Sequence, residues 1–110
     1  MKKIKLGKKI ITKKTPAYIV AEISANHCQS LKKAIKLIEI AKKTGADAVK
    51  IQTFKPESLA IRNINKNKSL LSKNSPWKKY NDRYELFKKA QLPYHWHKKL
   101  FQKAKKIDIT

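Results

Sequence analysis

The sequence has 110 residues, enough for one small domain with a modest hydrophobic core. Lysine and arginine number 28 against 7 acidic residues, which gives a formal net charge of +21. A charge of this size would suit a nucleic acid or an anionic membrane, but all except two of the basic residues are lysine. Sequence-specific readers of nucleic acid depend on the bidentate fork of arginine. Because Lys, Ile and Asn, which share A/T-rich codons, are abundant together, genome bias explains the charge, and no specific nucleic-acid partner is expected.

Cys28 is the only cysteine, so an intramolecular disulfide is excluded, as suits a reducing compartment. The basic stretch 1–14 has no apolar h-region, and Glu22 interrupts the best apolar run that follows it. These features predict no secretion signal, no membrane span and no membrane partner. The sequence therefore predicts a cytoplasmic protein.

The N-terminal half predicts a hairpin followed by a strand–helix–strand unit. Residues 1–14 form the predicted β-hairpin, which turns near Gly7. In residues 17–53, two apolar runs flank a stretch whose Leu, Ile and Ala residues recur at helical spacing. This pattern predicts strands at 17–23 and 46–52 and a helix at 31–44. Units of this kind place their strands parallel, with a right-handed crossover.

The C-terminal half predicts a long loop and then helices. Residues 54–79 contain Pro, Asn and Ser but no sustained period, and a connection of this length is usually functional or disordered. Residues 80–110 predict a helix from about Tyr84 to Ala90 and a second helix from Pro93 to about Lys106. The predicted apolar face of the second helix consists of His97, Leu100, Phe101 and Ala104.

The last four residues, 107–110, indicate the opening of a third strand. Parallel strands need both faces and both edges covered, and a (β/α)₈ barrel takes about 250 residues. The predicted fold class is therefore α/β. It comprises the first two βα units, plus the start of a third strand, of a TIM-type (β/α)₈ barrel, preceded by an N-terminal β-hairpin: an incomplete barrel.

Glu22 and Lys50 are the strongest candidates for a functional pair. Each lies near the end of an apolar run, where burying a lone ionised group costs on the order of several kcal/mol. In parallel α/β proteins, ligands bind beyond the carboxyl ends of strands. Gln52 shares a strand face with Lys50, and Asn26 and His27 lie in the first strand-end loop. Simple exposure and a structural ion pair remain the alternatives for the charged residues.

The chemistry of these side chains indicates what each could do. The ammonium of Lys50 could hold a phosphate or a carboxylate, and Gln52 could donate or accept hydrogen bonds with a sugar or an acid. Glu22 could move a proton or orient a substrate hydroxyl. His95 and His97 do not share a helix face at their spacing, so they predict no common metal site.

Two stretches of the sequence resemble the sialic acid synthase family. They are Ala21-Glu22-Ile23-Ser24-Ala25-Asn26-His27 and Gly45-Ala46-Asp47-Ala48-Val49-Lys50-Ile51-Gln52-Thr53. The later segment 84–101 is more similar to the pseudaminic acid synthase branch than to the N-acetylneuraminate branch. The resemblance covers nearly the whole chain but less than half of a family member.

The resemblance implies a (β/α)₈ barrel, usually followed by an antifreeze-like domain, in a swapped homodimer. The implied reaction condenses phosphoenolpyruvate with an N-acetylated aminosugar and releases phosphate. A divalent metal, Mn²⁺ or Mg²⁺, polarises the sugar aldehyde. By position, Glu22 corresponds to the active-site carboxylate, Lys50 to a lysine that binds phosphoenolpyruvate, and Gln52 to a residue beside the substrate. Asn26 and His27 match the motif.

The chain also departs from the family. The two metal-binding histidines, most phosphate-binding residues and the second domain of the family would lie beyond Thr110, so no metal ligand is expected in this chain. We therefore expect it to be inactive alone, as an interrupted gene, a fragment or one half of a split enzyme.

Three other interpretations remain open on the residues alone. One is a fragment of an N-acetylneuraminate synthase. Another is a Lys-rich nucleic-acid-binding module, which predicts binding that weakens steeply with salt and gives no reason for Glu22 and Lys50. The third is a non-catalytic remnant that needs a partner to cover its sheet edges.

Overall fold

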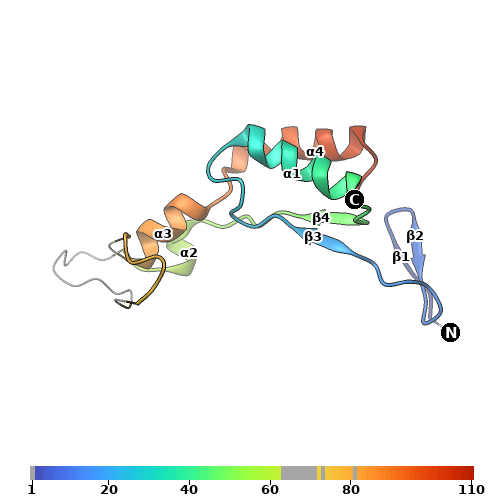
Figure 1. Cartoon of the computed structure of the whole chain (residues 1–110), viewed down its shortest axis with the longest axis horizontal. Coiled ribbons are helices and arrows are strands. Elements are labelled where there is room, and N and C mark those ends of the chain that lie inside the picture. Colours follow the sequence, from blue (N-terminus) through green and yellow to red (C-terminus); the bar gives the residue numbers. More distant parts are fainter. Residues whose placement is uncertain (1, 63–71, 73, 81) are drawn as a thin grey trace.

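The computed structural model describes residues 2–62, 72, 74–80 and 82–110 (Figure 1). Its strands are β1 (Ile4–Leu6), β2 (Lys9–Ile11), β3 (Val20–Glu22) and β4 (Ala48–Lys50). Its helices are α1 (Leu31–Lys43), α2 (Pro56–Leu59), α3 (Arg83–Ala90), the 3₁₀ turn η1 (Tyr94–Trp96) and α4 (His97–Lys106). The strands form two two-stranded sheets, β1–β2 and β3–β4, so the described residues form an α/β structure without a closed barrel.

The two sheets confirm the predicted hairpin and the predicted parallel unit. β1 and β2 pair antiparallel around Gly7, whose φ of +57° lies in the left-handed region that glycine adopts without strain. β3 and β4 pair parallel, with Glu22 opposite Lys50, and the Ile23 amide extends this ladder by donating to the Lys50 carbonyl at 3.1 Å. Each parallel strand has three residues, fewer than predicted, because the paired positions run only from Val20 and Ala48 to Glu22 and Lys50.

Helix α1 follows the predicted pattern closely. The Ser30 hydroxyl caps its N-terminus by accepting from the Lys33 amide at 3.3 Å. Two lysines occupy the last turn, where positive charge complements the helix dipole, and Gly45 follows with a φ of +87°. The helix therefore begins and ends within one residue of the predicted bounds.

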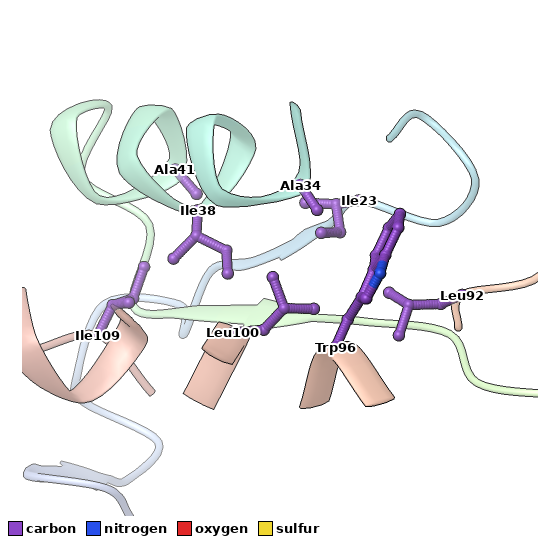
Figure 2. Close-up of a cluster of buried hydrophobic side chains, with 8 residues drawn as sticks. All are labelled: Ile23, Ala34, Ile38, Ala41, Leu92, Trp96, Leu100 and Ile109. Carbon is purple, nitrogen blue, oxygen red and sulfur yellow. The ribbon is translucent and has the colours of Figure 1, made fainter. Parts of the chain in front are cut away.

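The hydrophobic core lies between the β3–β4 sheet and the two long helices. Figure 1 shows α1 and α4 on the same side of β3 and β4. Figure 2 shows the buried cluster, whose members are Ile23, Ala34, Ile38, Ala41, Leu92, Trp96, Leu100 and Ile109. No described helix covers the other side of the two strands. Val20, at the start of β3, is accordingly exposed.

The C-terminal half differs from prediction in three places. The helix expected from Pro93 begins only at Tyr94, because Pro93 itself has an extended ψ of 129°, and its first turn is the 3₁₀ turn η1, which α4 continues. A short helix, α2, forms within the predicted loop 54–79, where Pro56 occupies its first turn; residues 63–71 and 73 of that loop lie outside the described residues. Phe101, predicted to be part of an apolar face, is 64% exposed because no described element covers its side of α4.

The end of the chain has the position, but not the regular pairing, expected of a third strand. The Val49 amide of β4 donates to the Thr110 carbonyl at 2.7 Å, and Ile109 is buried against the core. A single hydrogen bond does not make a strand, and residues 107–110 contain no strand.

Among the described residues, no helix is both long enough and apolar enough to span a bilayer.

Candidate functional site

Glu22 and Lys50 meet at the carboxyl ends of β3 and β4. The Lys50 Nζ lies 2.6 Å from the Glu22 Oε2. Strand alternation places both side chains on the sheet face opposite to Ala21 and Val49, which pack against the helical core. The pair therefore lies on the side of the sheet that α1 and α4 leave uncovered (Figure 1).

The burial predicted for the two charges is not found in this chain. The Glu22 side chain is 38% exposed and the Lys50 side chain 61% exposed. The reason is that no described element faces them across the sheet. An exposed pair of this kind contributes little to stability, so stability alone gives little reason for the pairing.

The neighbours of Glu22 hold its carboxylate in the ionised form. The hydrogen bond from Lys50 is the main cause that lowers the Glu22 pKa, and the Lys50 charge and the hydroxyl and amide of Ser24 lower it further. Desolvation acts in the opposite direction without reversing the shift. A carboxylate so held can accept hydrogen bonds and orient a hydroxyl. It becomes a useful base only after it separates from Lys50.

The loop between β3 and α1 is unusually constrained. Three of its residues other than glycine have positive φ: Ser24 at 41°, Cys28 at 47° and Gln29 at 57°. This conformation costs roughly 1–2 kcal/mol for a residue that bears a Cβ, so other contacts must hold the loop in place. Asn26 is exposed in this loop.

His27 lies in the core rather than beside Glu22. Its side chain is 0% exposed, and its ring meets the Trp96 ring edge-on, with centroids 5.5 Å apart. Its Nδ1 accepts from the Gln29 amide at 3.1 Å, so the neutral ring carries its hydrogen on Nε2. That Nε2 has no hydrogen-bond partner among the described residues. In this arrangement no atom of His27 is accessible to a substrate.

The burial of His27 predicts a pH dependence of stability. Desolvation lowers its pKa in the folded chain below the ordinary value of 6.5, so below that pH the unfolded chain binds a proton that the folded chain does not. The free energy of unfolding should therefore fall as the pH drops from 6.5 toward the lowered value, with a slope of at most about 1.4 kcal/mol per pH unit. Urea unfolding of the chain between pH 5.5 and 7.5 measures this slope. The His27→Gln variant should lose the part of the slope that comes from protonation of His27. An unchanged slope in that variant would contradict the lowered pKa of His27 as its cause.

The structure brings some of the predicted site residues together and separates others. Glu22 and Lys50 form one group at the strand ends, and exposed Gln52 follows two residues after the end of β4. Asn26 is exposed in the loop between β3 and α1, and His27 lies in the core. The role of Gln52 stays a prediction.

One further residue, Thr53, was missed by sequence reasoning because its partner is distant in the chain. Thr53, directly after Gln52, has its Oγ1 2.7 Å from the His97 Nε2. The Tyr94 ring stacks on the His97 ring, with ring centroids 4.7 Å apart. Thr53 belongs to the motif at the end of the second predicted strand, but nothing local indicates a partner 44 residues away.

A cavity of about 720 Å³ lies elsewhere, at the hairpin end of the sheet. Its lining includes Lys9, Asp47, Phe101 and Thr110 but neither Glu22 nor Lys50. Asp47 has a structural role there, because it accepts hydrogen bonds from Lys9 and from the Ile19 amide. We therefore place the candidate site at the Glu22–Lys50 end of the strands.

Comparison with known proteins gives a consistent result. Residues 37–110 match a sequence profile described as the NeuB family. The chain is 44% identical over 92 residues to a pseudaminic acid synthase of Campylobacter jejuni, which covers 84% of this chain and 26% of that protein. It is 40% identical over 94 residues to a pseudaminic acid synthase of Helicobacter pylori, which covers 86% of this chain and 27% of that protein.

A solved structure gives the same result. It is an N-acetylneuraminic acid (sialic acid) synthetase of Leptospira borgpetersenii in complex with citrate, with a TM-score of 0.71 and 25% identity. The match covers 98% of this chain and 32% of that one. The chain therefore spans about a quarter of the length of the curated relatives named above and about a third of that structure.

Proposed function

This chain belongs to the NeuB family, and on that premise we propose that it supplies the first βα units of a nonulosonic acid synthase barrel. The reaction we propose for the complete protein is the condensation of phosphoenolpyruvate with an N-acetylated aminosugar, with release of phosphate. Similarity to two pseudaminic acid synthases supports the pseudaminic branch over the N-acetylneuraminate branch. We further propose that the complete protein is a homodimer.

The observation that carries this proposal is the Glu22–Lys50 ion pair on the uncovered sheet face. In a closed barrel the face opposite the helices is the interior, and side chains at the carboxyl ends of its strands surround the substrate. Lys50 would bind an anionic group of phosphoenolpyruvate, beside Gln52. Because the phosphate and carboxylate of that substrate compete with Glu22 for the ammonium, substrate binding would release Glu22 to orient, or take a proton from, the sugar. Asn26 would contact substrate from the loop.

The described part of this chain has no cluster of side chains that could bind the metal of the proposed reaction. No three His, Cys, Asp or Glu side chains gather there closely enough to hold a cation. We propose that the residues that bind Mn²⁺ or Mg²⁺ belong to the remainder of the protein, and we assign no step of this chain to the metal.

A chimera tests the proposal. The 110-residue chain replaces the matching N-terminal segment of the C. jejuni pseudaminic acid synthase, and phosphate release is measured with phosphoenolpyruvate, Mn²⁺ and the aminosugar that the parent enzyme uses. We expect phosphate release that requires both substrates, and none above background from the 110-residue chain alone. A chimera that has the circular dichroism and melting behaviour of a folded barrel but does not turn over would refute the proposal.

A gel-shift series with the chain alone tests the nucleic-acid alternative. Binding through lysines should weaken steeply between 50 and 200 mM salt, by roughly 10³-fold or more if six or more phosphates are contacted. We expect no shifted species at 200 mM salt. Binding that falls steeply with salt but is tight enough at 50 mM to leave a shifted species at 200 mM, together with an inactive chimera, would favour the alternative.

A further inference from the structure

The segment that joins α3 to α4, residues 89–97, contacts both of the chain segments that carry the candidate site. One is the loop that follows Glu22, and the other is the end of β4 that follows Lys50. Among the described residues, the short β3–β4 ladder is the only strand pairing between these two parts of the chain. The contacts of residues 89–97 can therefore fix the relative position of the two segments.

The loop after Glu22 reaches the junction through two residues. The Gln29 side-chain amide donates to the Lys89 carbonyl at 3.0 Å and also to the Gln91 carbonyl. The His27 ring lies edge-on against Trp96 at an interplanar angle of 79°. The backbone N–H of Gln29 donates to the Nδ1 of His27. The contacts of Gln29 and of His27 therefore support each other and account for the left-handed backbone of Gln29.

The end of β4 reaches the same junction through Thr53. The Thr53 hydroxyl and the His97 Nε2 are 2.7 Å apart. His97 is in turn held between Tyr94, stacked on it at 22°, and Phe101, whose ring centroid is 6.2 Å away. These ring contacts orient the imidazole, and its hydrogen bond to Thr53 ties it to the residue directly after Gln52.

The core shows that this junction is rigidly placed. Leu92 and Trp96 are both buried in the main cluster, together with Ile23, the residue that follows Glu22 (Figure 2). Leu92 is almost fully buried in that cluster, and the Trp96 ring contacts the His27 ring. A junction packed in this way can act as a common reference for both strand ends.

We propose that residues 89–97 are the positioning element of the candidate site, with Gln29 and His97 as its positioning residues. Gln29 holds the loop that carries Glu22, and His97 holds, through Thr53, the strand end that carries Lys50 and Gln52. Neither residue needs to touch substrate. The inference rests on the proposed function, because it assigns a role in aligning that site. Misplacing a catalytic group by about 1 Å can cost roughly 100-fold in rate, so loss of one such contact has a measurable effect.

Steady-state kinetics of the chimera test the inference. Thr53→Val keeps the side-chain shape but removes the hydroxyl, so we expect KM for phosphoenolpyruvate to rise about 3- to 10-fold while kcat changes less than about twofold. Thr53→Ser restores the hydroxyl and should restore KM. Gln29→Met removes the amide that holds the Glu22 loop and should lower kcat about 3- to 10-fold with KM nearly unchanged. Gln102→Met, at an exposed position of α4, is the matched control.

The outcomes separate positioning from mere stability. A structural role alone would lower the melting temperature and leave the kcat and KM of the remaining folded enzyme as in the parent, and that result would overturn the inference. A failure of Thr53→Ser to restore KM would also overturn it.

If the parent chimera is inactive, the proposed function fails while the positioning contacts remain testable. Amide hydrogen exchange of the 110-residue chain should then accelerate at residues 50–54 in Thr53→Val and at residues 23–30 in Gln29→Met, but not in Gln102→Met. Exchange unchanged in both variants would overturn the inference independently of catalysis. If Thr53→Val does not fold, His97→Gln, which can still meet the hydroxyl, and His97→Leu, which cannot, make the same comparison.

Discussion

Replacing Lys50 by methionine in the chimera should lower kcat/KM for phosphoenolpyruvate by about 10- to 100-fold. Methionine keeps most of the side-chain length but has no charge, so the variant loses the contact that we assign to an anionic group of the substrate. A hydrogen bond to a charged group contributes about 1.5–3 kcal/mol, and about 1.4 kcal/mol corresponds to a tenfold change in kcat/KM. Steady-state phosphate release measures the effect.

The matched control for this variant is Lys32→Met. Lys32 lies on the exposed side of α1, so its loss changes the net charge equally without touching the strand ends. We expect kcat/KM within about twofold of the parent, as is usual for a surface substitution. Equal losses in the two variants would mean that general charge, and not a specific contact, attracts the substrate, and would contradict the role of Lys50.

Replacing Leu100 by alanine should destabilise the chain by about 2–5 kcal/mol. Leu100 is 1% exposed and belongs to the cluster that joins α4 to α1 and the sheet (Figure 2). Truncation removes its buried methyl groups and leaves a cavity that the neighbours fill only in part. Because small domains are stable by only about 5–15 kcal/mol, urea unfolding should show a large shift of the midpoint or loss of the transition.

Phe101→Ala provides the comparison for Leu100→Ala. The two residues are adjacent in α4, but Phe101 is largely exposed, so its truncation should cost less than about 1 kcal/mol. A cost as large as that of Leu100 would show that the uncovered side of α4 is packed in solution, against the arrangement described above.

The fold could be predicted wherever a short-range pattern decides it. Ser30, Gly45 and the apolar spacing between them determine α1, and the two apolar runs around that helix predict the parallel pairing. The start of η1 only after Pro93 could not be predicted from the helical period, because it depends on the extended backbone of Pro93. The exposure of Phe101 was also missed, since periodicity shows which residues share a face but not whether another element covers it.

The candidate site could be predicted as far as strand register extends. Equivalent positions on consecutive parallel strands become neighbours, so Glu22 and Lys50 were expected together. The Lys50 Nζ and the Glu22 Oε2 lie 2.6 Å apart. His27 follows Glu22 by five residues, but left-handed residues turn the loop and bury the ring under Trp96. The contacts of Gln29 and Thr53 span 60 and 44 residues, and no local pattern encodes such distances.

The uncovered side of β3 and β4 has a consequence for colloidal behaviour. An open strand surface invites self-association, whereas a net charge of +21 opposes it through mutual repulsion. That repulsion is screened beyond about 8 Å at physiological ionic strength. Purified molecules should thus stay dispersed in dilute buffer and cluster as salt is added, and light scattering would follow the change.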